Sequence, residues 1–271
     1  MKQRVVGIFD SGIGGLSVAR EIKRLMPDVS LVYVADSDFA PYGDKSPQSV
    51  GQRCELICQF LQAKEVDAIV VACNTATVHH IERLRQEFNL PFVGVEPGIK
   101  PAVAESRNKR VGVWATVQTS LSPNLLAHVE KYQTQADIYV QACPGLAEAV
   151  EQLDLAPTRL IDKYLSSLVE QDVDQLVLGC THYSFVIDAI RQRLKSSIEI
   201  VDTGNAVAKQ LVRLLSERTP LFEFTDAIPT TDTFYSSGEQ AIFDKQLLAL
   251  WPNSSYISDA VDLNLFAHDA A

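Results

Sequence analysis

The sequence predicts an α/β protein made of two pseudo-symmetric lobes, each with a mostly parallel sheet flanked by helices. Three observations lead to this prediction. Apolar, β-branched segments alternate with amphipathic helical stretches, these segments fall into two sets of four, and two sequence patterns recur at nearly the same offset. Alternation of strand and helix is typical of a parallel sheet with helices on both faces.

The predicted strands are short apolar runs with few charges, as expected of strands that are buried on both faces. They lie at residues 4–9, 31–35, 67–72, 92–95, 110–114, 137–140, 175–179 and 198–201. Helical patterns begin with 16–26 and 49–63, and a last helix is predicted at about 238–250. Residues 217–237 form the most irregular stretch.

The two sets of strands resemble each other. RVVGIFDS at 4–11 resembles RVGVWAT at 110–116, and AIVVACNT at 68–75 resembles QLVLGCTH at 175–182. Two matches with nearly one offset predict the duplication of an α/β unit. The alternative is that all buried parallel strands look alike, but the shared ending of a small residue, Cys and Asn or Thr favours duplication.

Composition and charge restrict the function. The chain has 271 residues and a net charge of −10, so it lacks the basic surface of a nucleic-acid-binding protein. No apolar run approaches the length of a membrane span, and the run at 5–9 is too short for a signal peptide. The five cysteines include no CxxC pair and predict free thiols in the reducing cytoplasm.

Polar segments follow several predicted strands, where ligand sites form in open α/β sheets. They are DSGIGG (10–15), APYGDKS (40–46), CNTAT (73–77), TVQT (116–119) and CTHY (180–183). DSGIGG is not a P-loop, because no Gly-Lys-Ser or Gly-Lys-Thr follows it. It does not match GxGxxG either, because Ser17 occupies the third glycine position. Such a turn can still bind an anion through its N–H groups. The alternative is a tight turn in which Asp10 caps the following helix.

Cys73 and Cys180 each end a predicted strand and precede a helix, where the helix dipole is expected to lower a thiol pKa. Either cysteine alone reads as inert core, but a duplicated pair suits racemisation, which needs an acid and a base on opposite faces of one carbon. His182 can polarise the Cys180 thiol or bind a carboxylate, or it simply begins a helix. Cys54, Cys58 and Cys143 read as structural, and no metal site is predicted.

The motifs FDSGIGGLSV, APYGDKS, VVACNTAT and LGCTHY, with VDTG at 201–204, resemble the glutamate racemases of the cofactor-independent aspartate/glutamate racemase superfamily. This resemblance implies interconversion of L- and D-glutamate for peptidoglycan synthesis, without pyridoxal phosphate or metal, in a cleft between two lobes. It implies a first lobe of residues 1–96 plus 206–271, an inserted second lobe of 97–205, and a homodimer.

By this resemblance, Cys73 takes the proton from D-glutamate and Cys180 from L-glutamate, while Asp10 and His182 assist the two thiols. The positions that the resemblance implies at the substrate or near the site are Ser11, Pro41, Tyr42, Gly43, Asn74, Thr75, Thr116, Thr119, Glu151 and Thr181. The chain departs from the family pattern at Gln118, where Gly is common, and at Ser184, where Pro is common. The chain also starts close to its first strand, so activation by a cell-wall precursor through a long N-terminal extension is not expected.

Two other functions remain open from the sequence. Cys180 and His182 can form the dyad of a thiol hydrolase or transferase, in which Cys73 is dispensable. A two-lobed amino-acid binding protein is the second alternative, and it needs no thiols at the cleft.

Overall fold

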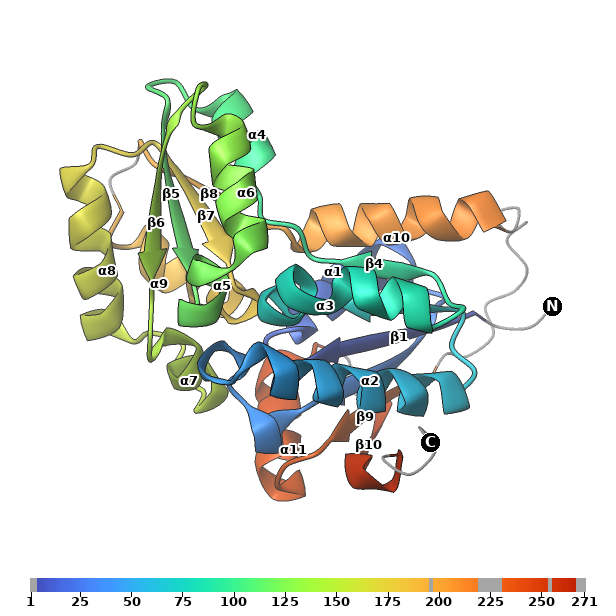
Figure 1. Cartoon of the computed structure of the whole chain (residues 1–271). Coiled ribbons are helices and arrows are strands. Elements are labelled where there is room, and N and C mark those ends of the chain that lie inside the picture. The colour runs from blue at the N-terminus through green and yellow to red at the C-terminus, as the bar shows by residue number, and fades with distance from the viewer. Residues whose placement is uncertain (1–3, 195–196, 219–230, 253–254, 267–271) are drawn as a thin grey trace.

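The structure is a computed structural model that describes residues 4–194, 197–218, 231–252 and 255–266. Its strands are β1 (Val5–Asp10), β2 (Ser30–Ala35), β3 (Ala68–Val71), β4 (Phe92–Gly94), β5 (Arg110–Ala115), β6 (Asp137–Ala142), β7 (Gln175–Gly179), β8 (Glu199–Val201), β9 (Asp232–Ser236) and β10 (Tyr256–Ala260). They form two parallel sheets in two lobes, ordered β10-β9-β2-β1-β3-β4 and β6-β5-β7-β8 (Figure 1). The predicted α/β class is therefore confirmed.

The order β2-β1-β3-β4 in the first lobe is repeated as β6-β5-β7-β8 in the second. β1 and β5 are the equivalent central strands, and each pairs with two neighbours in parallel register. This repetition supports the predicted duplication. It also gives Cys73, after β3, and Cys180, after β7, equivalent places in their sheets.

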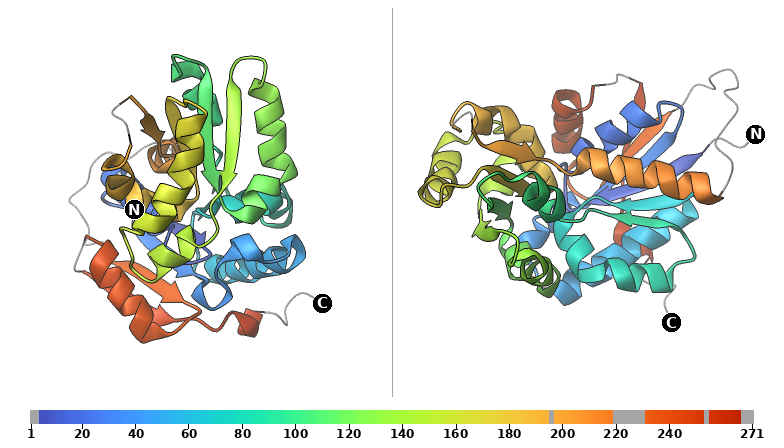
Figure 2. Two further views of the ribbon diagram at one scale, coloured as in Figure 1. Left: turned by 90° about the vertical axis from the view of Figure 1, so that its left-hand side faces the viewer. Right: turned by 90° about the horizontal axis from the view of Figure 1, so that it is seen from above.

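Helices cover both faces of each sheet (Figures 1 and 2). Beside the first sheet lie α1 (Leu16–Leu25), α2 (Pro47–Ala63), α3 (Asn74–Glu87), α10 (Gly204–Arg218) and α11 (Gln240–Leu250). Beside the second lie α4 (Ile99–Glu105), α5 (Val117–Leu121), α6 (Pro123–Tyr132), α7 (Leu146–Glu151), α8 (Thr158–Glu170) and α9 (Ile187–Arg191).

Local sequence explains where several helices begin. Ser46 caps α2 by accepting a hydrogen bond from the Ser49 N–H, and Pro47 occupies the first helical position. Ser122 and Pro123 begin α6 in the same way. The amphipathic helices then bury their apolar faces. In α1, for example, Leu16, Val18, Ala19 and Ile22 are buried.

The prediction of irregular structure for residues 217–237 is wrong where β9 forms, and residues 219–230 of that stretch lie outside the described residues. β9 pairs with β2 on one side and with β10 on the other, so it extends the first sheet. β10 was not predicted either. Polar and apolar residues are mixed in both strands, and β10 is largely solvent-exposed, so neither carries the continuous apolar run by which the other strands were found.

The two lobes meet at the carboxyl ends of β1, β3, β5 and β7 (Figure 1). The chain passes from β4 to α4 and returns from β8 to α10, and α10 packs beside α1. The lobe boundaries at residues 96/97 and 205/206 stay a prediction. Within the described ranges, no helix combines the length and apolarity that crossing a membrane requires.

Candidate active site

An enclosed cavity of about 20 Å³ lies between the lobes. It is lined by Ser11, Ala40, Pro41, Tyr42, Gly43, Cys73, Asn74, Thr75, Thr116, Ala147, Glu151, Cys180, Thr181 and His182. Every strand-end segment singled out in the sequence contributes to this lining. Of the expected site residues, Asp10 and Thr119 do not line the cavity but bond to residues that do.

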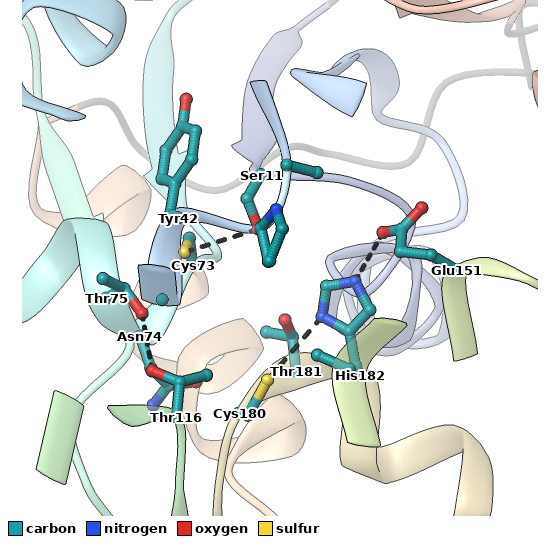
Figure 3. Close-up of a pocket in the computed structure, with 14 residues that line it drawn as sticks. Ser11, Tyr42, Cys73, Asn74, Thr75, Thr116, Glu151, Cys180, Thr181 and His182 are labelled. Atoms are coloured by element: carbon teal, nitrogen blue, oxygen red, sulfur yellow. Dashed lines mark hydrogen bonds and ion pairs between the residues drawn. The ribbon is translucent and has the colours of Figure 1, made fainter. Parts of the chain in front are cut away.

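The two cysteines reach the cavity from different lobes (Figure 3). Cys73 follows β3 and is the residue before the first turn of α3. Cys180 follows β7 and precedes a 3₁₀ helix at Thr181–Val186, which continues into α9. Their exposed fractions are 5% and 7%, so an intermediate formed between them is shielded from water.

The surroundings of Cys73 favour its neutral thiol. Burial raises the pKa of Cys73 well above its usual value, and the Asp10 carboxylate adds to this effect. The Ala76 N–H in the first turn of α3 and the Ser11 hydroxyl, 3.9 Å from Sγ, oppose the shift only in part. The expectation that a helix N-terminus lowers this pKa is therefore wrong for Cys73 in the closed arrangement, because desolvation outweighs the helix.

His182 connects Cys180 to Glu151. Its Nδ1 lies 3.7 Å from Sγ of Cys180, and its Nε2 lies 2.6 Å from Oε1 of Glu151 (Figure 3). Burial opposes a charged ring, but the hydrogen bonds with Cys180 and Glu151 outweigh it and raise the pKa of His182 well above its usual value. The folded surroundings therefore favour the imidazolium form of His182, which can donate a proton or a hydrogen bond to Cys180.

Asp10 does not line the cavity, but its carboxylate bonds to the glycine-rich turn at residues 10–15. It accepts hydrogen bonds from the Ser11 and Gly15 N–H groups, at 2.8 and 2.5 Å, and from Thr181 Oγ1 at 3.0 Å. Burial raises the pKa of Asp10, while His182 and the Ser11 N–H oppose the rise. The Ile13 N–H donates to Glu151 Oε1 at 2.8 Å. The turn thus binds two carboxylates of the protein itself. Asp10 stabilises the turn, whereas the N-cap of α1 is Gly15.

Three glycines mark where the second lobe approaches the first. A Cβ atom on Gly12 would lie 1.7 Å from Oε1 of Glu151. A Cβ atom on Gly14 would lie 2.3 Å from Nδ1 of His182, and one on Gly43 would lie 2.8 Å from Cβ of Thr116. None of these distances is possible for a side chain, so glycine here permits the lobes to close.

Three threonine hydroxyls join the lobes on another side of the cavity. Oγ1 of Thr75, in α3, lies 3.1 Å from Oγ1 of Thr116 and 3.0 Å from Oγ1 of Thr119. The Oγ1 atoms of Thr116 and Thr119 are 3.0 Å apart. Thr116 also caps α5 through the Thr119 N–H. These hydroxyls can exchange their mutual hydrogen bonds for bonds to a carboxylate that enters the cavity.

Tyr42 lines the cavity, but its hydroxyl bonds to a residue outside the cavity. The ring points away from the two cysteines, and the hydroxyl donates to Oδ2 of Asp36 at 2.7 Å (Figure 3). Asp36 is fully buried and also binds Arg53 and Ser237 Oγ. Tyr42 therefore fixes the segment that carries Pro41 and Gly43, and its hydroxyl is not available to a ligand.

Sequence reasoning missed Ala40 and Ala147, which line the cavity, and Gln246, which donates to Glu151. Ala40 stands in the quoted APYGDKS segment, so its position was a usable signal. Ala147 lies four residues before Glu151, which was expected near the site, so its segment was a usable signal. Gln246 carries no such signal, because only tertiary packing brings α11 to Glu151. Within the described ranges, no group of three or more His, Cys, Asp or Glu residues is arranged to hold a metal ion.

Comparison with known proteins agrees with this geometry. Residues 14–211 match the family model described as Asp/Glu/Hydantoin racemase. A glutamate racemase of Pseudomonas paraeruginosa is 43% identical over 250 residues, which cover 91% of this chain and 93% of that protein. The chain belongs to the Asp/Glu/Hydantoin racemase family.

Solved structures of glutamate racemases share the fold of this racemase family member. The Bacillus anthracis enzyme superposes with a TM-score of 0.86 at 30% identity, covering 97% of this chain and 99% of that one. The Francisella tularensis enzyme in complex with D-glutamate superposes with a TM-score of 0.84 at 26% identity, covering 98% and 100%. The two-lobed arrangement with the cavity between the lobes is therefore that of known racemases.

Proposed function

We propose that this chain is a glutamate racemase that uses Cys73 and Cys180 as the two acid–base groups. The observation that carries the proposal is the pair of thiols, which occupy equivalent strand ends in duplicated lobes and line one cavity. The solved relative bound to D-glutamate supports glutamate as the substrate. The product D-glutamate would supply peptidoglycan synthesis.

The proton balance follows from the two half-sites. From L-glutamate, the Cys180 thiolate removes the α-proton, so that an S–H bond forms as the Cα–H bond breaks. The electron pair left on Cα takes the proton of the Cys73 thiol from the opposite face. The product is D-glutamate, with Cys73 now a thiolate and Cys180 a thiol. The reverse reaction starts from that state, and exchange with solvent resets the pair.

The two thiols have different surroundings. Burial and Asp10 favour the neutral thiol at Cys73, which is the acid for the L-to-D direction. Cys180 instead has Nδ1 of His182 at 3.7 Å from its Sγ, so a proton donor or acceptor lies beside it.

Removal of the α-proton needs stabilisation of the developing carbanion. The cavity offers Ser11, Asn74, Thr75 and Thr181 as donors to the substrate carboxylates, and one such donor is worth about 3–4 kcal/mol in known oxyanion sites. The amide nitrogen of Asn74 is buried and has no hydrogen-bond partner among the residues that the structure describes, so it can take this role. Exclusion of water from the closed cavity strengthens each of these contacts.

The size of the cavity implies movement. About 20 Å³ is enough for roughly one water molecule, and glutamate is several times larger. The lobes therefore separate to admit the substrate. The inter-lobe bonds of Thr75 with Thr116 and of Asp10 with Thr181 are among those that opening would break.

The decisive experiment is proton exchange without added cofactor. Proton NMR in D₂O should show loss of the α-proton signal of either L- or D-glutamate, with inversion followed by circular dichroism. Folded protein that leaves both α-proton signals intact would refute the racemase function.

The role of each cysteine is tested by Cys73→Ser and Cys180→Ser, which keep the side chain small and polar. Each change should lower net racemisation by at least about a thousandfold, because each removes one of two essential proton carriers. Cys58→Ser is the matched control, since Cys58 is equally buried in the first lobe and does not line the cavity. Full activity in Cys73→Ser would instead favour a single-thiol hydrolase or transferase built on Cys180 and His182.

The remaining expectations are a homodimer in the cytoplasm without nucleic-acid or membrane partners. The net charge of −10 supports the last two. Light scattering on the eluted protein tests the dimer, and a monomer mass over the working concentration range would contradict it.

A further inference from the structure

We propose that Gln246, on the C-terminal helix α11, is a positioning residue that holds the Glu151–His182 pair against Cys180. Its effect on the reaction rests on the function proposed above, whereas its effect on His182 does not. Gln246 does not line the cavity, so it acts on the chemistry through Glu151.

The side chain of Gln246 contacts both the backbone carbonyl and the side-chain carboxylate of Glu151. Its Nε2 donates to the backbone carbonyl of Glu151 at 2.7 Å and lies 3.3 Å from the carboxylate Oε2. Glu151 is the last residue of α7, and Gln246 is only 4% exposed. A buried donor that reaches the end of a helix and its last side chain together restricts the orientation of that side chain.

The carboxylate of Glu151 is thus held by three separate elements. Oε1 accepts from the Ile13 N–H at 2.8 Å and faces Nε2 of His182 at 2.6 Å. Oε2 accepts a hydrogen bond from Nε2 of Gln246 at 3.3 Å. Ile13 and α11 both pack with the first sheet, whereas Glu151 and His182 serve the cysteine of the second lobe. The Cys180 half-site is therefore complete only when the first lobe supplies these two donors.

A groove beside the cavity explains why this donor matters. The groove has a volume of about 340 Å³ and is lined by Gln246 and Glu151, among others. Asp38, Glu148 and Glu239 also line it, and no Lys or Arg of the described ranges does. Without the Gln246 amide, the carboxylate of Glu151 is free to turn from His182 toward solvent in this groove.

The neutrality of Gln246 also fits this role. An amide donates to Glu151 without adding charge, so the imidazolium of His182 remains the cation nearest to that carboxylate in the described part of the chain. Asp10 and Cys180 are the other ionisable groups that face His182. A cation at position 246 would compete with His182 for Glu151 and make the imidazolium easier to deprotonate.

The test combines activity with an NMR titration of His182 in the full chain. Gln246→Met keeps the length of the side chain and removes the donor, and Gln246→Lys replaces it with a charged donor. Gln240→Met is the matched control on the same helix, because the side chain of Gln240 donates to Asp244 and Ser258, which lie outside the site. The ring resonances of His182 are assigned with a His182→Gln variant.

We expect Gln246→Met to lower kcat about tenfold, with KM within about twofold, and to lower the pKa of His182 by about one unit. Gln246→Lys should also lower the His182 pKa, and Gln240→Met should change neither quantity. A purely structural role would reduce thermal stability while leaving the His182 titration unchanged. An unchanged His182 pKa in both Gln246 variants overturns the proposal, and if one variant does not fold, the other decides.

Failure of the proposed function would look different. Wild-type protein would then show no exchange of the glutamate α-proton, while the His182 titration would still respond to Gln246→Met. Normal exchange in wild type, together with wild-type kcat and His182 pKa in Gln246→Met, refutes only the positioning role.

Discussion

Glu151 occupies the space that a side chain on Gly12 would need: a Cβ atom there would lie 1.7 Å from Oε1 of Glu151. The two residues belong to different lobes, and the Ile13 N–H beside Gly12 donates to the same oxygen at 2.8 Å. The glycine-rich turn is thus the surface on which the Glu151–His182 pair rests. The contacts that position Glu151 beside His182 therefore include contacts between the lobes.

Gly12→Ala should therefore displace Glu151 and lower kcat/KM by about a hundredfold, the cost of roughly 1 Å of misplacement at a catalytic group. The matched control is Gly204→Ala, because a Cβ atom there meets nothing closer than 3.5 Å. Steady-state racemisation by both variants checks the prediction. A Gly12→Ala enzyme within twofold of wild type would contradict it.

The His182–Glu151 pair should make stability depend on pH in a defined direction. The pKa of His182 is raised in the folded protein, so its contribution is fully present below the unfolded value of about 6.5. The contribution is lost as pH rises through the folded pKa, well above 6.5. We expect the free energy of unfolding lost in His182→Gln to be largest near pH 6 and to shrink toward pH 10.

Urea unfolding of wild type and His182→Gln over this pH range measures the difference directly. Asp10, Glu151 and Cys180 also face the ring, so the comparison uses the difference between the two proteins at each pH. A difference that grows with pH would show that the folded protein holds His182 neutral.

Tyr42 provides a contrast between structural support and substrate contact. Its hydroxyl donates to buried Asp36, which also binds Arg53 and Ser237. Tyr42→Phe should lower the free energy of unfolding by about 1.5 kcal/mol, the loss of one hydrogen bond to a charged group, and keep kcat/KM within about threefold. Asp36→Ala should cost about 3 kcal/mol or more, because it leaves Arg53 without its buried partner.

Chemical denaturation and steady-state kinetics on these two variants separate the effects. A loss of kcat/KM above about thirtyfold in Tyr42→Phe, at wild-type stability, would mean that the hydroxyl turns toward the substrate during turnover.

The strands and the two cysteines were accessible from sequence because both signals are local. A buried parallel strand is a continuous apolar run, and the polar segment after it marks the ligand-binding edge of the sheet. β10 was not predicted, because an exposed edge strand has no continuous apolar run. Gln246 was missed because its partner, Glu151, is distant in the chain, and Gln246 itself stands in no motif.

The pKa of Cys73 shows a second limit of local reasoning. The helix N-terminus that follows Cys73 is visible in the sequence, and its effect has the expected sign. The larger effect is desolvation, which depends on the tertiary packing that buries the thiol to 5% exposure. A rule based on neighbours in sequence cannot include that contribution, so the sign of the total was wrong.

Asp174 is a buried carboxylate of the second lobe that lies outside the candidate site and stabilises a turn. It accepts hydrogen bonds from Ser106 Oγ at 2.6 Å and from the Arg107 and Asn108 N–H groups at 2.6 and 3.2 Å. Burial favours its neutral form, but these donors outweigh it and hold the pKa of Asp174 below its usual value. Asp174 thus fixes the turn that leads from α4 into β5, the central strand of its sheet.

Asp174→Ala should lower the free energy of unfolding by about 2–3 kcal/mol at pH 7, because its donors lose a charged acceptor. Since the folded pKa is depressed, this contribution is present above the unfolded value of about 3.9 and is lost as pH falls through the folded pKa. Asp137→Ala, at an exposed position of β6, is the control and should cost less than about 0.5 kcal/mol. Urea unfolding at pH 7 and pH 3 should show a wild-type advantage over Asp174→Ala that narrows at the lower pH. An equal advantage at both pH values would mean that the Asp174 carboxylate is not what stabilises this turn.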